Sequence, residues 1–192
     1  MGYRPMINPM ENSMIPDFSK DEKFIVYKRK VIKDFKNIKE YFPLLKLTCL
    51  ITSIPKEIYI YGNLIPYEVL KKCKSKKDIE RNSLYVLGTY PSDFPKDNLY
   101  VEDFNKKIDW SDLPEHRRHR NVHPQTKREI LCTHYPNGEI NDYKVNDRNI
   151  VILSSAWKLY IQYKEYLKTG DWVLKDLPHD YGIKKVNLSP TP

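Results

Sequence analysis

The hydrophobic positions of this chain have helical spacing near both ends and strand-like spacing in between. Over residues 24–42, hydrophobic residues recur every three or four positions, which predicts an amphipathic helix that ends at Pro43. The segment Ser19–Glu22 has the spacing of a capping box and predicts the start of this helix. A second helical pattern spans Arg148–Leu167, and Gly170 follows it where a C-terminal glycine commonly ends a helix.

Strand-like segments lie between the two predicted helices. Leu44–Ser53 is as apolar and β-branched as a buried strand, and Ile58–Leu64 and Ser83–Tyr90 are further strand segments. Tyr67–Cys73 is a candidate extension of the same sheet, and a proline-rich loop region follows over residues 91–114. Strands grouped between terminal helices predict an α+β domain with an antiparallel meander of about four strands.

The same patterns give the expected domain limits. Residues 1–18 contain three prolines and four methionines without periodicity, so we expect a flexible N-terminal arm. A single domain is expected over residues 19–182, followed by a C-terminal tail over residues 183–192. The chain has no apolar run long enough for a membrane span and no hydrophobic N-terminal leader. Together with a count of three cysteines, this predicts a cytoplasmic protein with free thiols.

The formal net charge of +8 raises the possibility of nucleic-acid binding. Lysine is spread along the whole chain, however, and the densest cluster, Lys71–Lys77, falls in a predicted turn. A solvated surface is the simpler interpretation of that cluster, and a basic surface equally suits an acidic protein partner. Nucleic-acid binding therefore ranks third among the functions considered.

The segment Pro114–Asn141 has the highest density of potentially reactive side chains, because it contains Cys132 and four of the five histidines in the chain. Cys132 follows two apolar residues, so it is either a nucleophile or a plain buried thiol. A zinc site is a weaker alternative, because the chain has no Cys-x-x-Cys pair and Cys-x-His is poor spacing for tetrahedral coordination. No glycine-rich phosphate loop is present, and no cofactor or metal is expected. The four histidines are His116, His119, His123 and His134.

The order of these segments resembles the ubiquitin-conjugating (UBC) fold, in which a helix and a meander precede a long segment that ends in the active cysteine. In that family a His-Pro-Asn tripeptide lies about one strand before the cysteine, and here His123-Pro124-Gln125 precedes Ile130–Cys132. Upstream, Tyr90–Pro95 is similar to a Tyr-Pro-x-x-x-P corner of the family. Gln125 departs from the family asparagine, and the spacing to Cys132 is one residue short of the eukaryotic pattern.

A divergent bacterial branch of this family, found in antiviral CBASS-type operons, is the better match. The resemblance covers about residues 20–182 and includes Arg118–Arg120 before the cysteine and Cys132–Pro136 after it. The final helix also resembles that branch, at the positions Trp157, Tyr160, Tyr163, Leu167, Gly170, Trp172, Pro178 and His179.

This resemblance implies a transferase that carries a protein C-terminal acyl group as a thioester on Cys132 and passes it to an acceptor lysine. It implies an activating enzyme, with a cyclic-oligonucleotide synthase or a ubiquitin-like protein as acyl donor. Gln125 would stabilise the oxyanion, while His119, His123 or His134 would donate hydrogen bonds or lower the thiol pKa. The alternative is a catalytically inactive UBC-fold module that only binds a protein partner.

Overall fold

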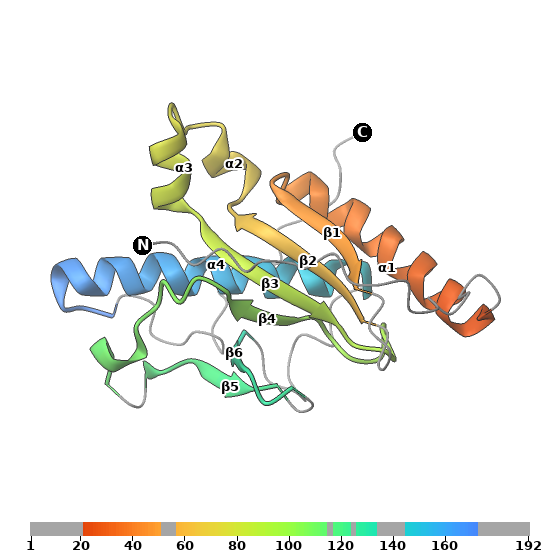
Figure 1. Cartoon of the computed structure of the whole chain (residues 1–192). Coiled ribbons are helices and arrows are strands. Elements are labelled where there is room, and N and C mark those ends of the chain that lie inside the picture. Colours follow the sequence, from red (N-terminus) through yellow and green to blue (C-terminus); the bar gives the residue numbers. More distant parts are fainter. Residues whose placement is uncertain (1–20, 51–56, 115–116, 124–125, 134–144, 173–192) are drawn as a thin grey trace, which may run out of the picture.

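In a computed structural model, residues 21–50, 57–114, 117–123, 126–133 and 145–172 are described. These residues form an α+β fold in which an N-terminal and a C-terminal helix cover one face of a four-stranded antiparallel sheet (Figure 1). A separate two-stranded hairpin lies beside the last strand of the sheet. The α+β architecture predicted from the hydrophobic pattern is therefore confirmed.

The first helix, α1 (Glu22–Tyr41), begins at Asp21, whose side chain accepts a 3.1 Å hydrogen bond from the Phe24 amide. The predicted cap at Ser19 is therefore wrong. Asp21 has the extended backbone of an N-cap, and its short carboxylate reaches the free amides of the first turn. The helix ends before Pro43, as predicted. One face of the helix is buried at a spacing of three or four residues, at Tyr27, Val31, Asp34 and Ile38.

The sheet has the strand order β1-β2-β3-β4, and every neighbouring pair is antiparallel. The first three strands confirm the predicted segments. The fourth strand lies inside residues 91–114, which were predicted to be a loop region. The strands are β1 (Leu45–Leu50), β2 (Glu57–Leu64), β3 (Leu84–Tyr90) and β4 (Tyr100–Asp103).

Side-chain alternation along these strands separates the two faces of the sheet. Ile58 and Ile60 of β2 are fully buried in the core that contains α1 and α4. Tyr59 lies between them in sequence and faces the other side, where it is paired across β2 and β3 with Thr89. Thr89 is in turn paired with Tyr100 of β4, so these three side chains form a row on the face opposite the helices.

The connection from β2 to β3 is helical, which corrects the prediction that Tyr67–Cys73 extends the sheet. Pro66 has no amide hydrogen for a strand ladder and instead precedes a single turn of helix, α2 (Tyr67–Leu70). The next helix, α3 (Lys76–Asn82), is capped by Ser75, whose hydroxyl accepts a 3.1 Å hydrogen bond from the Asp78 amide. The lysines of this connection are exposed, and Lys71 and Lys76 pair with Glu68 and Glu80 at 2.8 and 3.9 Å.

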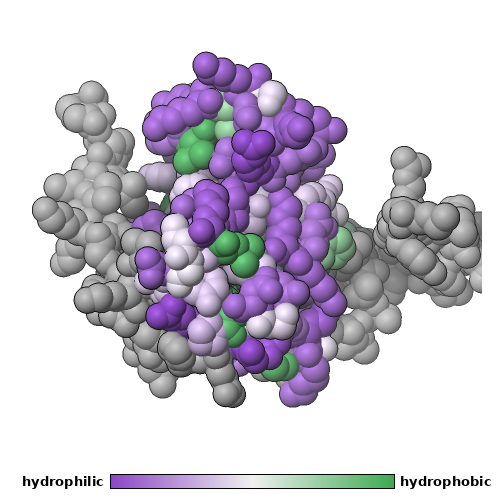
Figure 2. Space-filling model, turned by 90° about the vertical axis from the view of Figure 1, so that its left-hand side faces the viewer, coloured by the Kyte–Doolittle hydropathy of each residue, from purple (hydrophilic) through white to green (hydrophobic). Residues whose placement is uncertain are grey.

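The last helix, α4 (Val145–Thr169), confirms the second helical prediction. Gly170 follows it with a φ of 73°, and its amide donates a 2.8 Å hydrogen bond to the Tyr166 carbonyl. The side of the molecule turned toward the viewer in Figure 2 is mostly hydrophilic, with small separate hydrophobic patches. No helix in the described part of the chain is long and apolar enough to cross a membrane.

Candidate active site

Cys132 is positioned by a short hairpin formed by β5 (Arg120–Val122) and β6 (Glu129–Leu131). The strands pair antiparallel, with Asn121 opposite Ile130. At the turn, the His123 amide donates a 2.8 Å hydrogen bond to the Arg128 carbonyl. Because β6 lies beside β4, the hairpin brings the residue that follows β6 against the edge of the main sheet.

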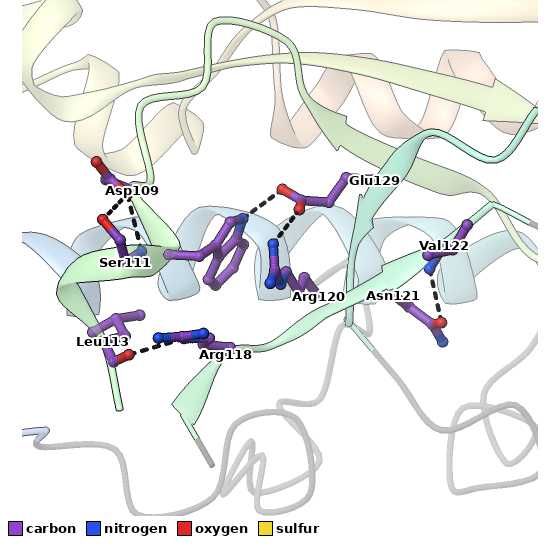
Figure 3. Close-up of polar contacts among 9 residues, drawn as sticks. Asp109, Ser111, Leu113, Arg118, Arg120, Asn121, Val122 and Glu129 are labelled. Carbon is purple, nitrogen blue, oxygen red and sulfur yellow. Dashed lines mark hydrogen bonds and ion pairs between the residues drawn. The ribbon is translucent and has the colours of Figure 1, made fainter. Parts of the chain in front are cut away.

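Polar contacts tie the hairpin to the preceding 3-10 turn, η2 (Trp110–Asp112) (Figure 3). The Trp110 indole donates a 2.6 Å hydrogen bond to one carboxylate oxygen of Glu129, and Arg120 pairs with the other oxygen at 2.8 Å. The Arg118 guanidinium donates a 3.0 Å hydrogen bond to the Leu113 carbonyl. These contacts attach β6, and the residues just before β5, to the segment that leaves β4.

Cys132 itself is half-buried and lines a pocket of about 290 Å³. Its amide donates a 2.8 Å hydrogen bond to the His119 carbonyl, so the backbone on both sides of the hairpin is joined at the cysteine. Cys132 is therefore neither enclosed in the core nor fully exposed. The pocket is lined by Asp97, Asn98, Leu99, Tyr100, Asn121, Val122, Ile130, Leu131, Cys132 and Thr133.

The environment of the thiol opposes ionisation. Burial raises the pKa of Cys132 above its ordinary value of 9.0. The thiolate is therefore a minor species at neutral pH, and a reaction at this thiol requires an electrophile that is already activated. This property suits exchange with a thioester more than attack on an unactivated amide or ester.

His123 is a buried structural residue next to the cysteine pocket rather than inside it. Its Nδ1 accepts a 3.2 Å hydrogen bond from the Thr126 amide, and its ring lies 4.5 Å from the Tyr100 ring in an edge-on arrangement. Burial lowers the pKa of the His123 imidazole, although the nearby Glu57 opposes this shift. A neutral imidazole at neutral pH gives no positive charge with which to activate Cys132.

His119 contacts the C-terminal end of the described chain. Its half-buried ring stacks on the Trp172 indole, with 6.0 Å between ring centroids and an interplanar angle of 17°. Trp172 also meets the Tyr166 ring of α4 edge-on. Since the His119 carbonyl accepts the Cys132 amide, this aromatic stack supports the backbone at the cysteine. Of the other candidate residues, Gln125, His116 and His134 lie outside the described residues.

Two asparagines that the sequence pattern does not single out, Asn98 and Asn121, line the cysteine pocket. The Asn121 side-chain oxygen accepts a 2.8 Å hydrogen bond from the Val122 amide (Figure 3), so its NH₂ group carries the donors for other partners. Asn121 could have been found from the hairpin pairing around the His123 turn. This pairing places Asn121 opposite Ile130, which lies two residues before the cysteine. Asn98 had no comparable signal, because its position depends on the path of the loop before β4.

The other two cysteines lie elsewhere. Cys49 on β1 is paired with Ile58 and packs against the core. Cys73 follows α2 and donates a weak 3.5 Å hydrogen bond to the Val69 carbonyl. In the described ranges, no three histidine, cysteine, aspartate or glutamate side chains are arranged to hold a metal ion.

Comparisons with protein-family models, with curated proteins and with solved structures found no match to this chain.

Proposed function

We propose that this chain is a UBC-like transferase that carries a protein C-terminal acyl group as a thioester on Cys132 and transfers it to an amine. The observation that supports this most directly is the shared pocket, which a half-buried cysteine lines together with two asparagines. Further support comes from the order of a helix, a four-stranded meander and a long segment that ends at the cysteine before the last helix. The proposed fold is accordingly UBC-like.

The chemistry has two steps. The Cys132 thiolate attacks the carbonyl carbon of an incoming thioester, a new C–S bond forms, and the donor thiolate leaves. A neutral acceptor amine then attacks the Cys132 thioester, the C–S bond breaks as an amide bond forms, and the proton lost by the amine nitrogen passes to the departing Cys132 thiolate or to solvent. Both steps pass through a tetrahedral oxyanion, for which the amide NH₂ groups of Asn121 and Asn98 are the described candidate donors.

The resemblance to the bacterial antiviral branch suggests the partners. The donor would be a cyclic-oligonucleotide synthase or a ubiquitin-like protein, loaded by an activating enzyme, and the acceptor would be a protein lysine. The overall positive charge of +8 suits an acidic donor or acceptor protein.

The experiment can be made independent of an unknown activating enzyme. Full-length protein is incubated with a synthetic peptide thioester that ends in glycine, and the adduct is followed by intact mass spectrometry and a non-reducing gel. We expect an adduct that reductant removes from wild type and that Cys132→Ala does not form, whereas Cys132→Ser can retain an oxyester. Cys49→Ala and Cys73→Ala are the matched controls and should load normally. An adduct that persists in Cys132→Ala, or that is lost in Cys73→Ala, shows that Cys132 is the wrong cysteine.

The same assay separates the roles of the amides. Asn121→Ala, and Gln125→Ala as predicted from the sequence, should slow aminolysis of a preformed Cys132 thioester if the residue contacts the oxyanion. Loss of one such donor costs about 3 kcal/mol of transition-state stabilisation, which slows the step by roughly a hundredfold. The variant with the larger effect on aminolysis, at unchanged thermal stability, identifies the donor.

A protein-binding module without transferase activity is the second candidate, and two observations favour it. Burial raises the pKa of the Cys132 thiol, and the face of the sheet opposite the helices carries an aromatic groove of about 450 Å³. Absence of any Cys132 adduct with a large excess of thioester at alkaline pH would support this function over transfer. The groove is lined by Thr48, Tyr59, Tyr61, Tyr85, Val86, Leu87, Phe104 and Arg128.

A further inference from the structure

A second pocket, of about 340 Å³, lies directly beside the cysteine pocket, because Asp97 and Tyr100 line both. This volume falls within the roughly 300–1,000 Å³ that is typical of ligand sites. Three carboxylate side chains line it, one from the start of β2 and two from the loop between β3 and β4. The residues that matter for its chemistry are Glu57, Thr89, Asp93, Asp97, Tyr100 and His123.

The charge in this pocket is negative. Glu57 is buried, whereas Asp93 and Asp97 are exposed and therefore lie toward the solvent. His123 adds no positive charge at neutral pH, because burial lowers its pKa. The nearby Arg128 forms a 3.4 Å ion pair with Glu102, and its charge also acts on His123, so it offsets part of the negative charge of the three carboxylates.

A buried hydroxyl without a partner is the second feature of this pocket. Thr89 is only 1% exposed, and among the described residues its Oγ1 has no hydrogen-bond partner. Its side chain is on the face of the sheet opposite the helices, between Tyr59 and Tyr100 in the strand register. Burial of a hydroxyl without a hydrogen bond costs free energy, so a ligand toward which the Thr89 side chain can rotate its hydroxyl, and which donates to it, would gain binding energy there.

We propose that this acidic pocket binds a primary ammonium group, and that the ligand is the acceptor lysine of the transfer reaction. An ammonium carries three N–H donors and one positive charge, which match the carboxylates and the Thr89 hydroxyl. The alkyl stem of a lysine can lie along the Tyr100 ring, as amphipathic side chains commonly do. The identity of the ligand as an acceptor rests on the proposed function, since the shared wall of Asp97 and Tyr100 would place the group beside the Cys132 thioester. The bound ammonium attacks only after it gives one proton to solvent and becomes a neutral amine.

The binding test uses full-length Cys132→Ala, which cannot form a thioester. Nα-acetyl-lysine N-methylamide is titrated into ¹⁵N-labelled protein, and amide chemical shifts are followed. We expect saturable shifts at Thr89, Tyr100 and His123, and weaker or absent shifts with the analogue whose side-chain amine is acetylated and therefore neutral. A titration with the corresponding arginine compound tests whether the pocket prefers the compact ammonium to a guanidinium.

Two pocket variants and one control make the result specific. Thr89→Val removes the hydroxyl at nearly constant volume, and Asp97→Asn removes one exposed charge. Each substitution should weaken binding of the lysine compound about tenfold, which corresponds to a loss of roughly 1.4 kcal/mol of binding free energy. The control is Glu68→Gln, because this carboxylate is 75% exposed on α2, which follows the end of β2 opposite to Glu57. It should leave the affinity unchanged.

Each outcome decides the proposal. Three results would overturn it: equal shifts with the neutral analogue, tighter binding of the arginine compound, or unchanged affinity for the lysine compound in Asp97→Asn. The result for Asp97→Asn is decisive even if Thr89→Val fails to fold. The proposed function is judged separately, by thioester loading on wild-type protein. Lysine binding without any loading leaves the pocket assignment standing and removes the transferase. Loading followed by aminolysis with an unchanged acceptor KM in Asp97→Asn removes the acceptor role and leaves the transferase.

Discussion

The Tyr90 phenol donates a 2.6 Å hydrogen bond to Oδ2 of Asp34, joining the end of β3 to the middle of α1. The same oxygen accepts a 2.9 Å hydrogen bond from the Asn149 side chain of α4, whose own oxygen accepts the Leu99 amide at 3.1 Å. One buried carboxylate therefore connects both helices, β3 and the loop before β4. That loop carries Asp97, which lines both pockets, so this network supports the proposed site from beneath the sheet.

Asp34 should make the stability of the fold depend on pH. Burial raises its pKa from 3.8 to about 6, although the hydrogen bonds from Asn149 and Tyr90 oppose this shift. Because the folded state holds the proton more tightly, the stabilisation is complete below pH 3.8 and is lost as the pH rises through about 6. The contribution is on the order of 3 kcal/mol. Urea denaturation across this pH range should show the loss in wild type.

Asp34→Asn is the matched variant for that measurement, because it keeps the size and an acceptor oxygen but cannot ionise. Its stability should fall less between pH 4 and 6 than that of wild type, although burial also raises the pKa of Glu102 and Asp103, so part of the slope remains. An identical slope in the two proteins would show that Asp34 does not titrate in this range.

Thioester loading on Cys132 should increase with pH. Burial raises the pKa of this thiol above 9.0, so the thiolate fraction grows about tenfold per pH unit through neutral and mildly alkaline pH. Initial loading rates with the peptide thioester, corrected for its hydrolysis, should follow this slope without reaching a plateau below pH 9.0. A plateau near neutral pH would reveal an activating cation outside the described residues.

Glu129 should hold the hairpin mainly through Trp110 rather than through Arg120. The ion pair with Arg120 is exposed, so Arg120→Ala and Glu129→Gln should each cost less than about 1 kcal/mol. Glu129→Leu leaves the buried Trp110 indole N–H without its acceptor and should cost about 1–3 kcal/mol. Hydrogen exchange at the Ile130 and Leu131 amides, together with the alkylation rate of Cys132, measures the loosening. Equal exchange in the Leu and Gln variants would contradict this assignment.

Two glycines with positive φ should differ in their tolerance of alanine. Gly62 has a φ of 131°, and a Cβ there would lie 2.7 Å from the Leu44 carbonyl oxygen, a backbone atom that cannot move aside cheaply. Gly170 has a φ of 73° with open space around it, so alanine there costs only the left-handed backbone, about 1–2 kcal/mol. Gly62→Ala should cost at least about 2 kcal/mol more than Gly170→Ala in urea denaturation. Equal losses would mean that β1 shifts to relieve the contact.

The elements predicted well were those with a long local pattern. The helix α1 and the helix α4 repeat hydrophobic residues over many turns, and β2 and β3 are rich in aliphatic and aromatic residues over eight and seven residues. The missed elements are short. β4 has four residues and α2 has four, and a pattern that brief is shared by strands, turns and loops.

Part of the candidate site could be chosen from local sequence features. Cys132 and His123 were identified because cysteine and histidine are scarce in the chain and cluster in one segment. The second pocket was not foreseen, because Glu57, Asp97 and His123 come from three distant segments and carry no shared sequence signal. Only the pairing of β2, β3 and β4, with the hairpin turn beside them, brings these groups together.

By itself, the sequence determined the type of the long elements, the α+β class and the choice of Cys132 as the candidate nucleophile, since these depend on local periodicity and side-chain chemistry. Tertiary structure alone decided which polar groups are buried and which are neighbours. Asp34 lies on an amphipathic helix, where an aspartate is ordinarily solvated, and only the packing of Tyr90 and Asn149 against α1 shows that it is buried. Burial and long-range contact depend on every element that packs around a residue. The sequence next to that residue therefore does not reveal them.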